Sequence, residues 1–431
     1  MSLHGWSRRS RYIGLAVVAL LALAACSSNS PASQSATTTA LNGSPIKVMT
    51  VGAVNCSACL SLPSLFATAH LYQEWVNDHG GIAGHPLVVE TCDDQGQPAL
   101  TAACGRKAEA DGDIAVVGSY DLNGAALVPV LQAEGIDDFG APVALSPIEY
   151  TSRDVQIMEA FTDGIIPKAV ADGCKKMAFL YYNLGSALDQ FDEHSTMVAF
   201  ESARALPLYK AAKIIFISAS AQDLAPQVTQ ALRGGTDCLM DFTSPQLTLE
   251  IMTAYASLGA KTRIYSLVGV GLEGAAEKGF VKQTNGSIVY GNYSGLDTPA
   301  YADFRAALAK FRPSSATSFD SQDSLGDWAA YTGFTNVVKS MKGPINKTTF
   351  LHAAQNATVC TGGMLPCIDF AKPSVLGPDF RNENDYYETF FKVENGQDVP
   401  LYGGKFYDFE GTLTGAPLPA ADMPPATPLQ S

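Results

Sequence analysis

The sequence predicts an α/β protein with two successive units, each a parallel β-sheet covered by helices. Apolar, β-rich runs alternate with amphipathic helical stretches at intervals of about 30 residues, which is the pattern of repeated strand–helix–strand crossovers. This pattern stops and restarts once, near Phe161. A chain of 431 residues is also too long for one ordinary hydrophobic core, so two domains are expected.

The first unit begins with an apolar strand at residues 46–54. Residues 65–78 then have helical spacing and end before Gly80-Gly81, as a helix C-terminus commonly does. The same alternation continues to the end of the unit. The other expected strands are residues 87–91, 114–118 and 141–145, and the other expected helices are residues 98–110 and 127–134.

The second unit repeats the alternation. Its expected helices are residues 165–171, 189–205, 225–232 and 247–258, and its expected strands are residues 177–182, 214–218, 239–242, 264–268 and 286–290. Two long amphipathic helices follow, at residues 299–311 and 325–341. Residues 369–401 are expected to form short strands and turns.

The first 45 residues have the composition of an export signal followed by a tether. Arginines near the start precede an uncharged apolar run that ends in Leu23-Ala24-Ala25-Cys26. This order is typical of an export signal, and the run is short for a membrane span. Its cysteine ending resembles the lipobox of bacterial lipoproteins, which implies a signal peptide at residues 1–25 and lipidation of Cys26. Residues 26–45 contain almost no large apolar side chain and are expected to be a flexible tether; an uncleaved anchor is the alternative.

Composition and motifs exclude several classes of function. The net charge of −14 disfavours nucleic acid and anionic membrane surfaces as partners. The six histidines show no metal-ligand spacing, and the chain has neither a phosphate-binding P-loop nor a nucleophile elbow, so we expect no metal, no cofactor and no enzyme activity. A GxGxxG match at residues 269–274 comes too late in the chain for a dinucleotide site.

Eight cysteines besides Cys26 form an even number in an exported chain, which predicts disulfides. Three pairs are close in sequence. Cys174 and Cys238 each precede an apolar run, and parallel strands that start side by side would bring them together. The predicted bridges are Cys56–Cys59, Cys92–Cys104, Cys174–Cys238 and Cys360–Cys367. A redox role for the CxxC at residues 56–59 is the alternative, although no thioredoxin-like context surrounds it.

Two motifs carry a resemblance to a known family. The helix at residues 69–77 is followed by Gly80-Gly81-Ile82-Ala83-Gly84-His85-Pro86-Leu87 and then by Asp93-Asp94, and Phe391-Lys392-Val393-Glu394-Asn395-Gly396 is similar to a terminal hairpin. Over about residues 46–410 the chain resembles the type I periplasmic substrate-binding proteins of branched-chain amino-acid ABC importers. The resemblance implies two Rossmann-like lobes with parallel sheets, joined by a three-segment hinge, with a small ligand in the cleft between them.

The resemblance also implies a division of the chain. Crossings near Phe161, Asn292 and Val359 assign residues 46–161 and 293–358 to lobe 1 and residues 162–292 and 359–415 to lobe 2. The Pro/Ala-rich residues 416–431 are expected to be a frayed tail.

The implied protein is a monomer, lipid-anchored at the outer face of the cytoplasmic membrane, that delivers a small molecule to ABC permease subunits. A receptor of the same fold that signals instead of transporting is the alternative, and an extracytoplasmic enzyme is a third possibility.

Candidate ligand-binding residues follow the strands, because ligands of doubly wound sheets bind beyond the carboxyl ends of the strands. They are Ser119, Tyr120, Asp121, Leu145 and Ser146 in lobe 1 and Asn183, Phe242, Thr243, Val268 and Gly269 in lobe 2. Similar proteins hold a ligand carboxylate with hydroxyl groups, a role for Ser119 and Ser146. The second-lobe acid that amino-acid binders offer to the ligand ammonium is missing near Val268, so Asp121 is its candidate replacement and an uncharged solute is the alternative. Core packing, turn formation and helix capping are the structural alternatives for these residues.

Overall fold

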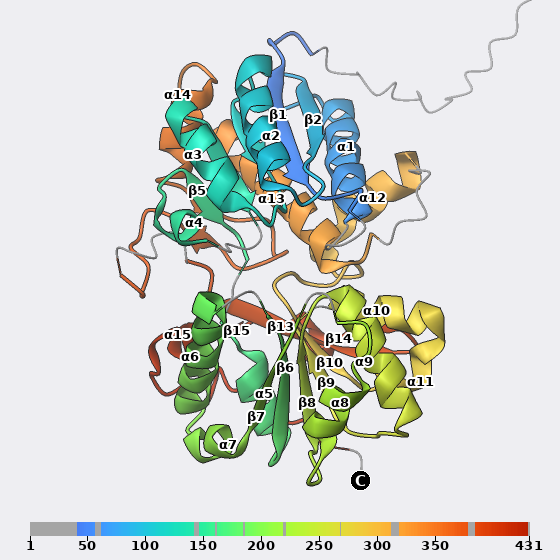
Figure 1. Ribbon diagram of the computed structural model, residues 1–431. Coiled ribbons are helices and arrows are strands. Elements are labelled where there is room, and N and C mark those ends of the chain that lie inside the picture. Colours follow the sequence, from blue (N-terminus) through green and yellow to red (C-terminus); the bar gives the residue numbers. More distant parts are fainter. Residues whose placement is uncertain are drawn as a thin grey trace, which may run out of the picture. The chain divides into compact units, whose positions relative to one another are not determined.

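A computed structural model describes the protein over most of its length. The described residues are 41–56, 62–141, 146–159, 162–183, 186–218, 221–267, 269–311, 319–377 and 384–429. They form two α/β assemblies, each built around its own sheet (Figure 1). Within these ranges no helix is both long enough and apolar enough to cross a bilayer.

The first assembly contains a five-stranded sheet in the order β2-β1-β3-β4-β5, in which every pair of neighbours is parallel. Its strands are β1 (Ile46–Gly52), β2 (Leu87–Asp93), β3 (Ala115–Val117), β4 (Asp137–Ala141) and β5 (Val155–Ile157). Its helices are α1 (Pro63–Asp78), α2 (Pro98–Asp111), α3 (Gly124–Glu134), α4 (Pro147–Thr151), α12 (Ala302–Phe311), α13 (Gln322–Ser340) and α14 (Lys347–Ala354). The first assembly also contains a small antiparallel pair of strands, β11 (Thr358–Val359) and β12 (Ile368–Asp369).

Helices cover both faces of this sheet (Figure 1). Val48 points into a core formed with α1, α12 and α13, whereas its neighbour Met49 points into a core formed with α2 and α3. In the first of these cores Trp328 of α13 stacks on Phe304 of α12, with ring centroids 4.5 Å apart. Burial on both faces explains why the central strands β1 and β3 are mostly apolar instead of alternating.

The second assembly contains a sheet in the order β14-β13-β10-β9-β8-β6-β7, with β15 paired to β13. Its strands are β6 (Met177–Tyr182), β7 (Lys213–Ile217), β8 (Cys238–Phe242), β9 (Arg263–Ser266), β10 (Ile288–Gly291), β13 (Tyr387–Glu394), β14 (Gln397–Pro400) and β15 (Tyr407–Asp408). Its helices are α5 (Ile165–Ala171), α6 (Ser186–Ser202), α7 (Leu206–Ala211), α8 (Ala225–Leu232), α9 (Pro245–Ser257), α10 (Gly269–Ala275), α11 (Val281–Thr284) and α15 (Glu410–Thr414). The strands from β6 to β10 are parallel, and β13 and β14 form the predicted terminal hairpin.

The fourth strand is a correction to the sequence analysis. It was expected at residues 141–145, but β4 covers Asp137–Ala141, and residues 142–145 lie outside the described part of the chain. The apolar pattern missed it because it begins with two acids. Asp137 and Asp138 are both buried, and burial raises the pKa of each carboxyl well above its usual range.

The chain passes three times between the two assemblies. The first passage lies between β5 and α5, and the second is at Asn292, since Tyr290 packs in the second assembly and Tyr293 in the first. The third passage was expected near Val359, but Val359 and Ile368 are buried in the core of the first assembly, so the passage lies between β12 and β13. These contacts assign residues 358–369 to the first assembly.

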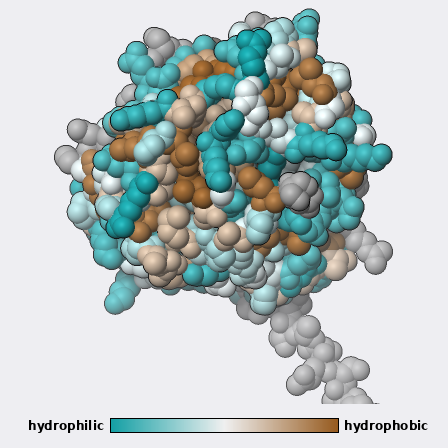
Figure 2. Space-filling view, turned by 90° about the horizontal axis from the view of Figure 1, so that it is seen from below, coloured by the Kyte–Doolittle hydropathy of each residue, from teal (hydrophilic) through white to brown (hydrophobic). Residues whose placement is uncertain are grey.

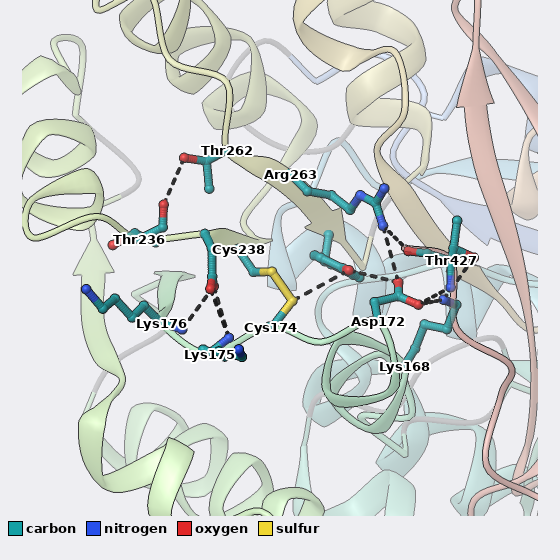
Figure 3. The surroundings of a disulfide bond; sticks show 12 residues. Lys168, Asp172, Cys174, Lys175, Lys176, Thr236, Cys238, Thr262, Arg263 and Thr427 are labelled. Carbon is teal, nitrogen blue, oxygen red and sulfur yellow. Dashed lines mark hydrogen bonds and ion pairs between the residues drawn. A yellow bond between two sulfur atoms is a disulfide. The ribbon is translucent and has the colours of Figure 1, made fainter. Parts of the chain in front are cut away.

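The end of the chain is also more ordered than its composition suggests. Residues 416–431 were expected to fray, but the amide of Leu418 donates to the carbonyl of Ser202 (3.0 Å) and the amide of Thr427 donates to Asp172 Oδ1 (2.6 Å). Arg263 donates to the carbonyl of Thr427 (Figure 3) and to that of Pro428. Side chains of the second assembly therefore hold this Pro-rich segment, a contact that composition does not reveal.

Three of the four predicted disulfides are confirmed. The pairs Cys92–Cys104, Cys174–Cys238 and Cys360–Cys367 are bonded, with Cα–Cα distances of 5.7, 5.8 and 4.3 Å. Figure 3 shows the Cys174–Cys238 bond. The reasoning for this pair holds, because β6 and β8 are parallel neighbours with Met177 paired to Cys238. In the fourth predicted pair, Cys59 lies outside the described residues, as does Cys26.

Candidate functional site

The predicted site residues of the first assembly lie on the turn after β3. Ser119 is buried, and its hydroxyl oxygen accepts a hydrogen bond from the amide of Val51 (2.8 Å). The amide of Tyr120 donates to the carbonyl of Val51 (3.0 Å), so the turn is fixed to the end of the neighbouring strand β1. Burial raises the pKa of Tyr120, with the carboxylates of Glu159 and Asp323 adding to the effect, so this phenol stays protonated.

Asp121 ends this turn and is 7% exposed. Its Oδ1 accepts from the amide of Asn123 (2.8 Å), which forms a local turn directly before α3; the N-cap of α3 is Asn123, and no described side chain caps this helix. Burial, with the nearby Glu149 carboxylate, raises the pKa of Asp121 to about 7. Ser146 is half-buried and donates from Oγ to Glu149 Oε2 (2.6 Å). Asp121, Ser146 and Glu149 therefore form one acidic group beyond β3 and β4, and Leu145 lies outside the described residues.

The predicted residues of the second assembly divide into core and exposed ones. Phe242 packs edge-to-face on Tyr181, with centroids 5.0 Å apart, and Thr243 donates from Oγ1 to the buried Asp241 (2.6 Å), so both contribute to the core. Asn183, at the end of β6, is exposed, and its amide donates to the carbonyl of Ile217 (2.9 Å). Gly269 is buried at the start of α10, and Val268 lies outside the described residues.

Sequence reasoning missed an acidic group that includes Glu273 of α10 and Asp398 of β14. Burial raises the pKa of Glu273 to about 9, and the carboxylates of Asp398, Asp320 and Asp323 add to this effect. Burial and Asp320 raise the pKa of Asp398 to about 7. Gly269 packs so closely on Asp398 that a Cβ at this position would collide with the carboxylate. Glu273 and Asp398 are 125 positions apart, and only the sheet topology brings them together.

A further acidic group lies on the passages between the assemblies. Burial raises the pKa of Glu159 to about 8; the side chain of Asn292 hydrogen-bonds to this carboxyl and opposes the shift, while Asp323 and Asp385 add to it. Asp323, at the start of α13, accepts a hydrogen bond from Ser64 at the start of α1. Glu388 of β13 accepts from the amides of Thr162 and Gly164 (3.3 and 3.4 Å), which joins the first passage to the third.

The charge of these groups limits the chemistry of a bound solute. Among the described residues, no Lys, Arg or His contributes to the pKa of Asp121, Glu159, Glu273, Asp385 or Asp398. Within the part of the chain that the structure describes, the charged side chains that a solute carboxylate would meet at these groups are acids, and an unpaired buried charge is costly. Neutral carboxyls can instead donate or accept hydrogen bonds, and an ionised one can pair with an amine.

A hollow of about 550 Å³ lies at the opposite, amino ends of β8, β9 and β10. It is lined by Lys261, Arg263 and Lys282, but Arg263 is already paired with Asp172 and with the end of the chain. Figure 2 shows the molecule from below, and on that face hydrophilic residues separate the apolar areas from one another. We assign no ligand to this hollow.

The chain matches the family model for periplasmic binding proteins over residues 45–397. It therefore belongs to this family, and its two parallel-sheet assemblies have the fold of the type I proteins, as the motifs after β1 predicted. No match was found among the curated proteins compared.

Solved structures share the fold at low sequence identity. A substrate-binding periplasmic protein from Ralstonia solanacearum is 17% identical, with a TM-score of 0.67 over 82% of this chain and 99% of that chain. The branched-chain amino acid transporter substrate-binding protein LivJ from Streptococcus pneumoniae, solved with isoleucine, is 15% identical, with a TM-score of 0.64 over 82% and 97%. An ABC transporter solute-binding protein from R. palustris, solved with benzoate, is 17% identical, with a TM-score of 0.61 over 89% and 99%.

Proposed function

We propose that the protein is an extracytoplasmic, lipid-anchored solute-binding protein that captures a small molecule in a cleft between its two lobes and delivers it to an ABC importer. The family match over residues 45–397 carries this proposal. Polar side chains after the parallel strands of both sheets support it, because this is where doubly wound sheets bind ligands. Hinge closure over the solute requires that the closed state bind it better than the open one.

The acidic groups support a solute that is uncharged or carries an amine. A branched-chain amino acid remains within this class only if backbone amides and hydroxyl groups satisfy its carboxylate. Asp121 is the residue that we propose faces an amine, because its carboxyl titrates near neutral pH and lies beyond β3. Tyr120, Ser146 and Asn183 keep part of their surface exposed and are the proposed polar partners.

A thermal-shift screen tests the solute class with four panels: amino acids, amides, amines and small aromatic acids. A ligand at 100 times its dissociation constant stabilises the folded state by about 2.7 kcal/mol, which is readily measured. We expect hits among the first three panels, and Asp121→Asn should weaken binding of a cationic hit at least about tenfold. The matched control is Asp303→Asn, which changes an exposed acid on α12.

Three outcomes would contradict the proposal. A best ligand from the aromatic acids, bound equally by the Asp121→Asn variant, would exclude the proposed solute class. Recovery of a chemically altered ligand would identify an enzyme instead of a binding protein. Co-purification with a kinase or regulator, and not with permease subunits, would favour the sensor, and membrane release of a Cys26→Ser variant would support the anchor.

A further inference from the structure

Three carboxylates meet at the edge of the first sheet that lies under α2. Glu90 belongs to β2, Asp111 ends α2, and Asp113 follows two residues later, before β3. One oxygen from each lies within 4.8 Å of the others. Two oxygens on opposite sides of a calcium ion would be about 5 Å apart, since each Ca–O distance is about 2.3–2.6 Å. The separation therefore fits one shared cation.

Local structure fixes these three groups in place. Glu90 and Cys92 are two positions apart on one face of β2, and Cys104 and Asp111 are two turns apart on one face of α2, so the disulfide Cys92–Cys104 sets the spacing of strand and helix beside the cluster. Gly112 then ends α2 with a φ of 76°, and the amide of Asp113 returns to the carbonyl of Ala108 (2.9 Å).

Asp113 is the group that points to a ligand. It is only 1% exposed, and neither of its carboxylate oxygens has a hydrogen-bond partner. A buried carboxyl without partners is costly, and such groups in proteins are normally paired or bound to a metal. Burial, with the charges of Glu90 and Asp111, raises the pKa of Asp113 to about 7.

Lysine side chains neutralise only part of this cluster. Lys107 Nζ pairs with Glu90 and with Asp111, and Lys47 Nζ donates to the carbonyl of Asp111 (3.0 Å). The side chain of Lys107 is 45% exposed, so its ammonium can turn into solvent and release both carboxylates. Lys107 is therefore a competitor for the same oxygens, and a divalent cation at this point would also reach Asp113.

We propose that Glu90, Asp111 and Asp113 form a binding site for a divalent cation of the calcium type. All three ligands are hard oxygens, which calcium prefers, and water can complete the coordination on the exposed side of Glu90 and Asp111. The cation takes the place of the Lys107 ammonium between Glu90 and Asp111. Sequence motifs do not reveal the site, because its ligands come from two segments without a fixed spacing.

Isothermal titration of the chelator-treated protein with CaCl2 at pH 8 tests the site. We expect saturable binding with a dissociation constant of about 10⁻⁴–10⁻³ M, as in extracellular modules. Asp113→Asn and Glu90→Gln should each weaken it at least about tenfold. Lys107→Gln should instead tighten it, because the competing ammonium is gone. The matched control is Asp78→Asn, which breaks a surface pair with Lys310 in the same assembly and should leave CaCl2 binding unchanged.

A comparison of two cations gives a second measurement. MgCl2 should bind more weakly than CaCl2, because Mg²⁺ demands a stricter geometry and gives up its water reluctantly. No heat of binding at about 5 mM CaCl2, equal binding by Asp113→Asn, or weaker binding by Lys107→Gln would each overturn the site. Tighter binding of MgCl2 than of CaCl2 would overturn the calcium assignment.

Discussion

Asp172 in the second assembly and Asp113 in the first are buried carboxylates with opposite surroundings. In the second assembly Asp172 pairs with Lys168 and Arg263, and it accepts hydrogen bonds from Tyr265 Oη (2.8 Å) and from the amide of Thr427 (2.6 Å) (Figure 3). In the first assembly Asp113 has no hydrogen-bond partner for either oxygen.

The comparison distinguishes a carboxylate that stabilises the fold, Asp172, from one that can still bind a cation, Asp113. Cations and donors surround Asp172 on every side, so its charge is compensated within the chain, and burial lowers the pKa of Lys168 only against the opposing effect of Asp172. Asp113 has lysines near its neighbours but none bonded to itself, so it titrates near neutral pH. An external cation would stabilise a buried carboxylate most where the protein provides no hydrogen-bond partner for it.

The largest effect on stability is expected from removing the carboxylate of Asp172, which is paired with Lys168 and Arg263. Asp172→Ala leaves Lys168 and Arg263 buried or half-buried without their acid, which should lower the free energy of unfolding by about 3–5 kcal/mol in urea titration. The double variant Lys168→Met/Asp172→Leu should recover part of this loss, since it removes both charges of the closest pair. A loss below about 1 kcal/mol in Asp172→Ala would show that the network is not structural.

The two disulfides provide the next comparison. Removing Cys174–Cys238, with a separation of 64 residues, should cost about 4 kcal/mol, and removing Cys92–Cys104, with a separation of 12, about 3 kcal/mol, because the longer loop restricts the unfolded chain more. Paired Cys→Ser variants measured by urea unfolding test the order. The reverse order would mean that native contacts, and not loop length, decide the cost.

The smallest effect, and one of opposite sign, is expected at Asp113. Its folded pKa of about 7 exceeds the ordinary value of 3.8, so its contribution to stability is present at low pH and is lost as the pH rises from about 4 to 7. Asp113→Asn should therefore be more stable than wild type by about 1–3 kcal/mol at pH 8 without divalent cations, and no more stable at pH 4. Equal stability of the two proteins at pH 8 would show that the carboxylate has partners.

Sequence patterns predicted best where one local signal decides the structure. The apolar spacing and the flanking loops placed α8 at Ala225–Leu232 without error, and parallel-strand geometry paired Cys174 with Cys238. The pattern failed at β4, where Asp137 and Asp138 are buried as acids, because hydropathy assigns such residues to the surface.

The candidate site was less accessible to this reasoning. Strand ends located Asp121 and Ser146 in one acidic group, but Phe242 and Thr243 proved to be core residues, since a strand end does not specify which way each side chain points. Glu273 and Asp398 meet only through the hairpin at the edge of the second sheet. Contacts over such separations depend on tertiary structure, and a single sequence carries no signal for them.

The repeated passage of the chain between the assemblies has a consequence for biogenesis. The first sheet needs α12 and α13 to cover one of its faces, and these helices follow the five parallel strands of the second sheet in the sequence. While the polypeptide emerges from a ribosome or a translocation channel, this face of the first sheet stays uncovered. The first assembly can therefore complete its core only after the chain has emerged as far as the end of α13.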